Sequence, residues 1–169
     1  YGWDPSTKPN DNVEINEECD TIALMKGNNN GHNVFGDTEL EPSQIHKINF
    51  FIHKVYFLHL GICSVNGMKK FLNQTHNGFQ GDTDTYGTSY FTDKCFRRNY
   101  GAIFSNGHEI MKIEALKESD KLCMIINLVN GKLDYQLNGK SVGLNQDIKK
   151  DIKYKIAFMA YGHNKVQIM

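Results

Sequence analysis

This 169-residue sequence has no net charge, no long apolar run and no closely spaced cysteines. Lysine and arginine together number 19 and are balanced by 19 acidic residues, so no basic excess is available to attract nucleic acid or an anionic membrane. No apolar run approaches the roughly 18 residues that a membrane-spanning helix needs. The composition therefore argues against nucleic-acid binding and against membrane insertion.

Motifs of catalysis and metal binding are also lacking. The sequence contains no GxSxG, no HExxH, no phosphate-binding glycine loop and no DxDxDG calcium loop. The histidines follow no spacing that converges on a metal site. The four cysteines, Cys19, Cys63, Cys95 and Cys123, form no CxxC pair, and we expect free thiols in a reduced compartment, with two disulfides in a secreted domain as the alternative. We expect that this chain is not an enzyme and that it binds neither a metal nor a cofactor.

The length and composition indicate one globular domain that covers residues 1–169. Hydrophobic residues make up 40% of the chain and charged residues 22%, which is ordinary for a folded domain and unlike a disordered one. The chain opens with Tyr-Gly-Trp-Asp and has no initiating methionine or signal peptide, which predicts a piece of a longer protein. We expect a monomer with a cytoplasmic, intracellular location.

Helix signals are scarce, and strand signals are plentiful. Two short segments, residues 68–74 and 114–118, are the best helical candidates. Lys121–Val129 is apolar on both faces, as in a central strand of a sandwich. In Lys132–Leu137 the residues alternate, which predicts Leu133, Tyr135 and Leu137 on the buried face. The pattern predicts an all-β fold with one or two short helices.

Turn signals separate these strands at regular intervals. Asn130-Gly131 and Asn138-Gly139 each predict a two-residue type I′ hairpin, because both central positions of that turn need φ > 0. Residues 154–160 and 165–169 are expected to complete the sheet on either side of a tight corner at 161–164. Many short strands with regular turns predict a two-sheet antiparallel β-sandwich.

Several segments resemble one known family in order and spacing. Ser119–Gly143 shows an Asp-led apolar strand, a hairpin and a strand that ends in Asn-Gly-Lys. Tyr154–Met169 contains an aromatic-Gly-His corner, and Leu60–Ser64 (LGICS) is similar to a family strand that usually reads VGVAS. The chain resembles the SPRY (B30.2-like) domain, a jelly-roll sandwich related in architecture to concanavalin. Its motifs are closest to those of the SOCS-box-associated SPRY proteins.

The chain also departs from the family pattern. Ile48 stands near the position of a usual tryptophan, and Thr88 replaces the second aromatic of an aromatic-Gly-aromatic strand. The loop that binds partners in the SOCS-box-associated group is shortened here, at residues 53–57. No SOCS box, RING or B-box is present, which leaves the peptide motif and any ubiquitin-ligase role open.

The resemblance implies a non-catalytic adaptor or scaffold domain that binds a partner protein or peptide through loops at one end of the sandwich. It places Tyr161 at the centre of that site, with Gly162 and Ala160 beside it. Two rims are expected to flank this centre, one carrying His76 and Phe79 and the other carrying Lys54 and Tyr56. As alternatives, Tyr161 is a half-buried corner residue that packs on loops, and Phe79 is part of the core.

Two other functional classes remain at this point. A glycan-binding, lectin-like domain would use an aromatic platform beside acidic residues, and Asp82 and Asp84 lie near Tyr86 in the sequence. A purely structural domain would bury the same end of the sandwich against its own parent chain. Calcium-dependent glycan binding would indicate the first class, and a stable contact within the longer protein would indicate the second.

Overall fold

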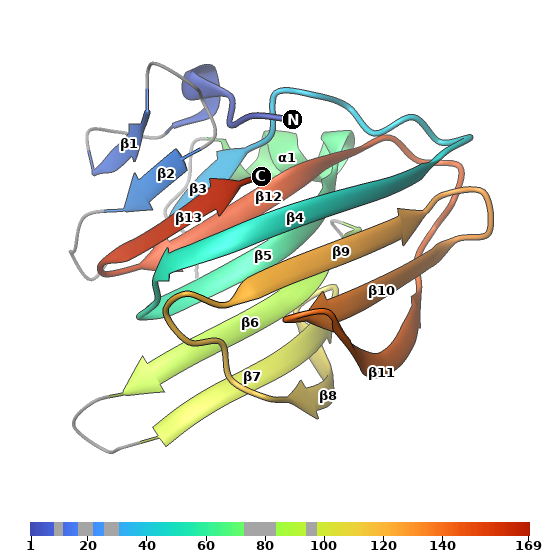
Figure 1. Ribbon diagram of the computed structural model, residues 1–169. Coiled ribbons are helices and arrows are strands. Elements are labelled where there is room, and N and C mark those ends of the chain that lie inside the picture. The colour runs from blue at the N-terminus through green and yellow to red at the C-terminus, as the bar shows by residue number, and fades with distance from the viewer. Residues whose placement is uncertain (9–11, 17–21, 26–30, 73–83, 94–97) are drawn as a thin grey trace.

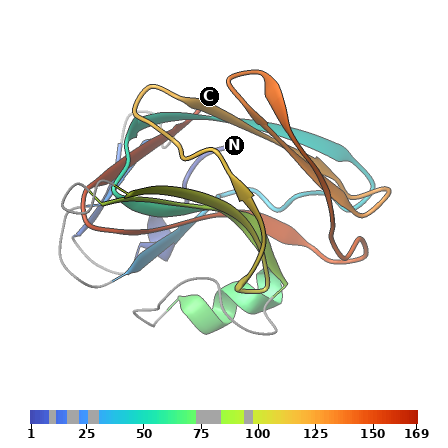
Figure 2. The ribbon, with the colours of Figure 1, turned by 90° about the horizontal axis from the view of Figure 1, so that it is seen from below.

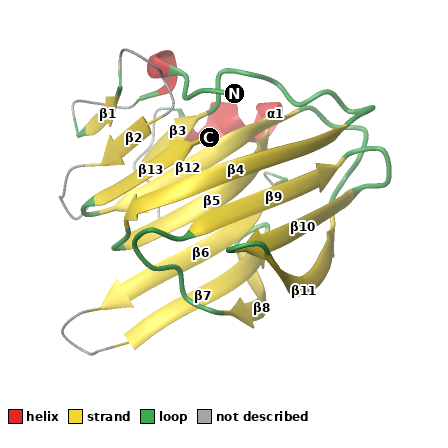
Figure 3. Ribbon diagram, viewed as in Figure 1, coloured by secondary structure: helices red, strands yellow, loops and turns green. Residues whose placement is uncertain are grey.

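The computed structural model describes residues 1–8, 12–16, 22–25, 31–72, 84–93 and 98–169, and strands dominate these ranges (Figure 3). A 3-10 helix spans Pro5–Thr7 and the α-helix α1 spans Val65–Phe71. The strands are β1 (Val13–Ile15), β2 (Ile22–Met25), β3 (His32–Phe35), β4 (Ile45–Lys54), β5 (Phe57–Ser64), β6 (Thr85–Asp93), β7 (Arg98–Ser105), β8 (His108–Ile113), β9 (Lys121–Asn127), β10 (Lys132–Leu137), β11 (Lys140–Asp147), β12 (Tyr154–Tyr161) and β13 (Asn164–Ile168).

The strands form two antiparallel sheets that pack face to face (Figures 1 and 2). One sheet has the order β1-β2-β13-β4-β9-β10-β11, and the other has the order β3-β12-β5-β6-β7-β8. The predicted two-sheet antiparallel sandwich is therefore confirmed. The expectation that residues 154–160 and 165–169 lie in one sheet is wrong, because β12 and β13 belong to different sheets. The chain also crosses from one sheet to the other between β4 and β5.

The core lies between the sheets and follows the predicted alternation. Leu133, Tyr135 and Leu137 of β10 are buried, as predicted, and β9 is an interior strand between β4 and β10. Trp3 is also fully buried, with its ring 5.6 Å from that of Phe158 in one sheet and 6.4 Å from that of Phe50 in the other. The N-terminal segment thus contributes a large aromatic side chain to the shared core.

The two Asn-Gly turns differ from each other. Asn138 and Gly139 have φ values of 50° and 80°, which confirms the predicted two-residue turn between Leu137 and Lys140. At the other turn only Gly131 has positive φ, and four residues separate the paired Asn127 and Lys132. The type I′ prediction is wrong there because Leu128 is buried in the core, which ends β9 early and lengthens the loop.

The helix predictions were correct for one segment and wrong for the other. Helix α1 begins at Val65, before the predicted start, because the Ser64 hydroxyl accepts a hydrogen bond from the Gly67 N–H at 2.9 Å and caps it. Residues 114–118 form no helix. There the Asp120 carboxylate accepts from the Lys117 N–H at 2.7 Å, and Ser119 has a φ of 74°, so the chain turns back toward β4.

Two of the four cysteines lie in the described part of the chain. Cys63 and Cys123 are buried free thiols, as expected. Burial raises the pKa of the Cys63 thiol to about 12, with a smaller contribution from the nearby Asp84 charge, so this side chain stays protonated and unreactive at neutral pH. Cys19 and Cys95 lie outside the described residues.

Candidate functional site

Two connections between the sheets lie side by side at one end of the sandwich (Figure 1, left). The β4–β5 connection carries Lys54 and Tyr56, and the β12–β13 corner carries Tyr161 and Gly162. Strand pairing brings the two connections together, since Tyr161 lies opposite Phe57 in one sheet and Lys165 lies opposite Lys54 in the other. Four of the predicted site residues, from distant parts of the sequence, therefore share one region, which we call the crossing end (residues 53–57 and 161–165).

A single buried amide fixes the crossing end. Asn164 is fully buried, and its Oδ1 accepts a hydrogen bond from the Tyr56 N–H at 2.7 Å. Its Nδ2 donates to the Tyr161 carbonyl at 2.6 Å and to the Gly162 carbonyl at 3.4 Å. One side chain thus satisfies backbone groups of both connections and holds them in fixed relative positions. No motif or spacing in the sequence indicates this role of Asn164.

Tyr161 lies on the outer face of the six-stranded sheet and is partly buried. Its ring meets that of Phe57 edge-to-face at 5.1 Å, and it packs beside the cluster of Phe35, Cys63, Phe71, Ala157 and Met159. Burial raises the pKa of its hydroxyl above the ordinary value for tyrosine, so the group stays a neutral hydrogen-bond donor at physiological pH. Tyr161 therefore combines a packed ring with a partly accessible edge.

Tyr56 is the exposed aromatic residue of the crossing end, with 45% of its surface accessible. Its ring lies against Gly162, where an added Cβ would come within 2.6 Å of Tyr56 Cδ1. Gly162 also has a φ of 68°, a left-handed conformation that favours glycine. The absence of a side chain at Gly162 therefore serves the internal contact with Tyr56 and positions that ring at the surface.

The charge of the crossing end is positive. Lys54 is exposed and lies opposite Lys165, and neither lysine forms an ion pair with any residue in the described ranges. His163 is exposed in the same corner. The crossing end therefore combines an exposed tyrosine with two lysines that have no ion-pair partner among the described residues.

The remaining predicted site residues have different surroundings. Ala160 is fully buried and points into the core, so its side chain supports the corner from beneath. His76 and Phe79 lie outside the described residues, and the rim that they were expected to form stays a prediction. The aromatic residue needed by the glycan-binding alternative, Tyr86, is buried at 4% exposure, and Asp84 pairs with Lys149 at 2.6 Å.

A row of rings extends from Tyr161 across the outer face of the six-stranded sheet. Phe57 contacts His59 at 5.1 Å, and His59 contacts Phe104 at 5.9 Å between ring centroids. Burial lowers the pKa of His59 to about 4, and its Nε2 is 3.4 Å from the Ser89 hydroxyl. His59 is therefore a neutral member of this row at physiological pH.

Within the described ranges, no three His, Cys, Asp or Glu side chains are placed to hold a metal ion together. The helices in those ranges include none that is both long enough and apolar enough to cross a membrane.

Comparison with known proteins identifies the fold. No family model and no curated protein matches the sequence. Solved structures that match 99% of this chain include the SPRY domain of human HERC1 (TM-score 0.71, 14% identity, 96% of that chain), the PSpry domain of TRIM65 (TM-score 0.72, 12% identity, 90% of that chain) and a human SPRY domain (TM-score 0.64, 13% identity, 96% of that chain). The chain therefore has the SPRY fold, and the closer similarity to the SOCS-box-associated group stays a prediction.

Proposed function

We propose that this chain is a non-catalytic protein-interaction domain that recognises a peptide or surface loop of a partner through the crossing end. The observation that carries the proposal is the arrangement around Asn164, where one buried amide holds Tyr56 and Tyr161 in adjacent connections. Rigid loops that present tyrosines provide contact area at a low entropic cost. The proposal extends to this chain the mode of binding implied by its resemblance to the SOCS-box-associated SPRY proteins.

The partner that fits this end carries an acidic group beside an apolar or aromatic side chain. Tyr56 offers an exposed ring, Tyr161 a partly exposed edge, and Lys54 with Lys165 an unbalanced positive charge. Since hot spots concentrate in a few aromatic residues, replacement of one tyrosine is expected to weaken binding by about 2 kcal/mol. His76 and Phe79 are proposed as a second rim of the same site.

The test is affinity capture of partners from cell lysate by the wild-type domain, Tyr56→Ala, Tyr161→Ala and the control Ile45→Ala. Ile45 is 60% exposed and lies at the opposite end of β4 from Lys54, so its replacement removes an exposed apolar side chain away from the crossing end. We expect Tyr56→Ala and Tyr161→Ala to lose a partner that Ile45→Ala retains, in captures made well below the melting temperature of each variant.

Other results point to the remaining classes. Retention of the partner by both tyrosine variants would place binding on another face and contradict the proposal. Calcium-dependent binding to a glycan array would favour the lectin-like alternative. A stable contact of the crossing end with the rest of a longer chain would favour the structural one.

A further inference from the structure

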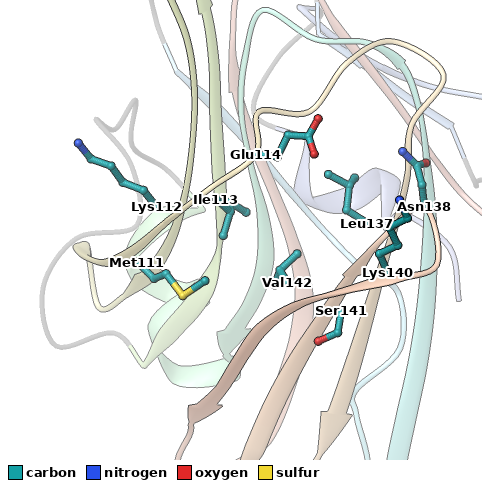
Figure 4. Close-up of a pocket in the computed structure, with 9 residues that line it drawn as sticks. All are labelled: Met111, Lys112, Ile113, Glu114, Leu137, Asn138, Lys140, Ser141 and Val142. Carbon is teal, nitrogen blue, oxygen red and sulfur yellow. The ribbon is translucent and has the colours of Figure 1, made fainter.

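A cleft of about 460 Å³ opens along one side of the sandwich, away from the crossing end. It lies between β8 and the β10–β11 hairpin and is lined by Met111, Lys112, Ile113, Glu114, Leu137, Asn138, Lys140, Ser141 and Val142. Figure 4 shows Met111, Ile113, Leu137 and Val142 pointing into it from opposite walls. Met111, Ile113 and Val142 are only partly buried and pack against the main core. The floor of the cleft is thus an accessible extension of the core.

Both walls of the cleft are edge strands. Strand β8 ends the six-stranded sheet and β11 ends the seven-stranded sheet. Among the described residues, β8 pairs with β7 alone and β11 with β10 alone, so each strand has one side without a ladder partner. An edge of this kind presents backbone donors and acceptors to another extended segment.

A bulge in β11 lies beside the cleft. Asp134 pairs with Asn145 and Gln136 pairs with Ser141, so three residues, 142–144, lie opposite Tyr135. Gly143 in this bulge has a φ of 85°. Bulges bend the strand and redirect side chains, and here Val142 points into the cleft (Figure 4). The regular pairing of β10 with β11 is therefore interrupted where Val142 lines the cleft.

The charge along the cleft is positive. Glu114 is already paired with Lys117 at 3.3 Å. Lys112 and Lys140 are exposed, and neither forms an ion pair with another described residue. On β8, Lys112 lies between Met111 and Ile113 and points away from the cleft (Figure 4). A strand added along β8 would therefore place alternate side chains in the apolar cleft and beside Lys112.

We propose that the cleft binds an extended segment of a partner protein in which apolar residues alternate with acidic residues. The segment adds to the sheet along β8 by backbone hydrogen bonds. Its apolar side chains fill the space between Met111, Ile113 and Val142, and its acidic side chains lie opposite Lys112. This site is separate from the crossing end and does not depend on it.

The test uses three fluorescein-labelled octapeptides and fluorescence anisotropy. The first alternates Val with Glu, the second alternates Val with Lys, and the third is the Val-Glu peptide N-methylated at alternate backbone amides. We expect the Val-Glu peptide to bind at least about tenfold more tightly than either other peptide, since charge pairing and strand addition both contribute. Amide chemical-shift changes should concentrate at Met111, Ile113 and Val142.

Matched variants separate this site from the crossing end. Lys112→Glu is expected to weaken binding of the Val-Glu peptide by about tenfold, because a favourable charge pair becomes a repulsive one. Lys70→Glu, at an exposed position of α1, makes the same change in net charge and should leave binding unaltered, as should Tyr56→Ala.

The proposal is overturned if the Val-Glu peptide does not bind, if it binds no better than the Val-Lys peptide, or if Lys112→Glu behaves like Lys70→Glu. It is also overturned if the chemical-shift changes map to another edge.

Discussion

The crossing end and the β8–β11 side are both places where the two sheets meet, but of these two only the β8–β11 side presents strand edges without a ladder partner among the described residues. At the crossing end Asn164 binds the Tyr56 N–H and the Tyr161 carbonyl internally. At the β8–β11 side, each of the two strands has an edge without a described ladder partner. The first arrangement is suited to presenting side chains from fixed loops, and the second to pairing with an added backbone.

The largest effect on stability is expected from Asn164→Ala, which removes the internal hydrogen bonds of the crossing end. The variant leaves the part-buried Tyr56 N–H and Tyr161 carbonyl without their internal partner, so the free energy of unfolding should fall by about 1–3 kcal/mol in total. Denaturant unfolding measures this. Asn145→Ala, at an exposed position of β11, is the control and should change stability by less than about 0.5 kcal/mol. Equal effects of the two replacements would show that Asn164 does not fix the crossing end.

The pH dependence of stability tests whether His59 is buried in its neutral form in the row of rings that begins at Tyr161. Burial lowers the pKa of His59 to about 4 in the folded protein, below the ordinary value near 6.5 in the unfolded chain. The unfolded state therefore binds more protons between these two values, and stability should fall as the pH drops from 7 to 5, by about 1–2 kcal/mol.

His59→Gln isolates this contribution, because His32 is also buried with a lowered pKa and acts in the same direction. Unfolding free energies at pH 7 and pH 5 should differ less in the variant than in the wild type. Identical pH dependence of the two proteins would mean that His59 is not buried in its neutral form.

A smaller effect distinguishes the glycines of the two regions. Gly162 and Gly143 both have positive φ, so replacement by alanine strains either position by about 1 kcal/mol. An alanine Cβ at position 162 also meets the Tyr56 ring, whereas nothing lies within 4 Å at position 143. Gly162→Ala should therefore lower the melting temperature more than Gly143→Ala. The reverse order would contradict the tight contact between Gly162 and Tyr56.

The parts of this molecule that local rules decide could be predicted from the sequence. The alternation in Lys132–Leu137 and the turn at Asn138-Gly139 depend on neighbouring residues alone, and both are correct. The sheet that a strand joins depends on distant partners, which is why the crossings after β4 and β12 were missed.

In the candidate site, too, some residues could be identified from the sequence and others depend on distant partners. The resemblance selected Tyr161, Gly162, Lys54 and Tyr56, which the fold brings together. It could not select Asn164, whose Tyr56 partner is 108 positions away in the chain. The β8–β11 cleft could not be predicted either, because it lies between the edge strands of two sheets, and the position of a strand in a sheet depends on distant partners.

Site-specific photo-crosslinking tests the central claim, recognition of a partner by the crossing end, most directly. A benzophenone amino acid is placed at position 56 in one protein and at position 45 in another, since both native side chains are exposed, but Ile45 begins β4 and Tyr56 follows its far end. In cell lysate, position 56 should give a covalent adduct with a discrete partner protein that position 45 does not give. An adduct from position 45 alone, or the same adduct from both positions, would contradict recognition through the crossing end.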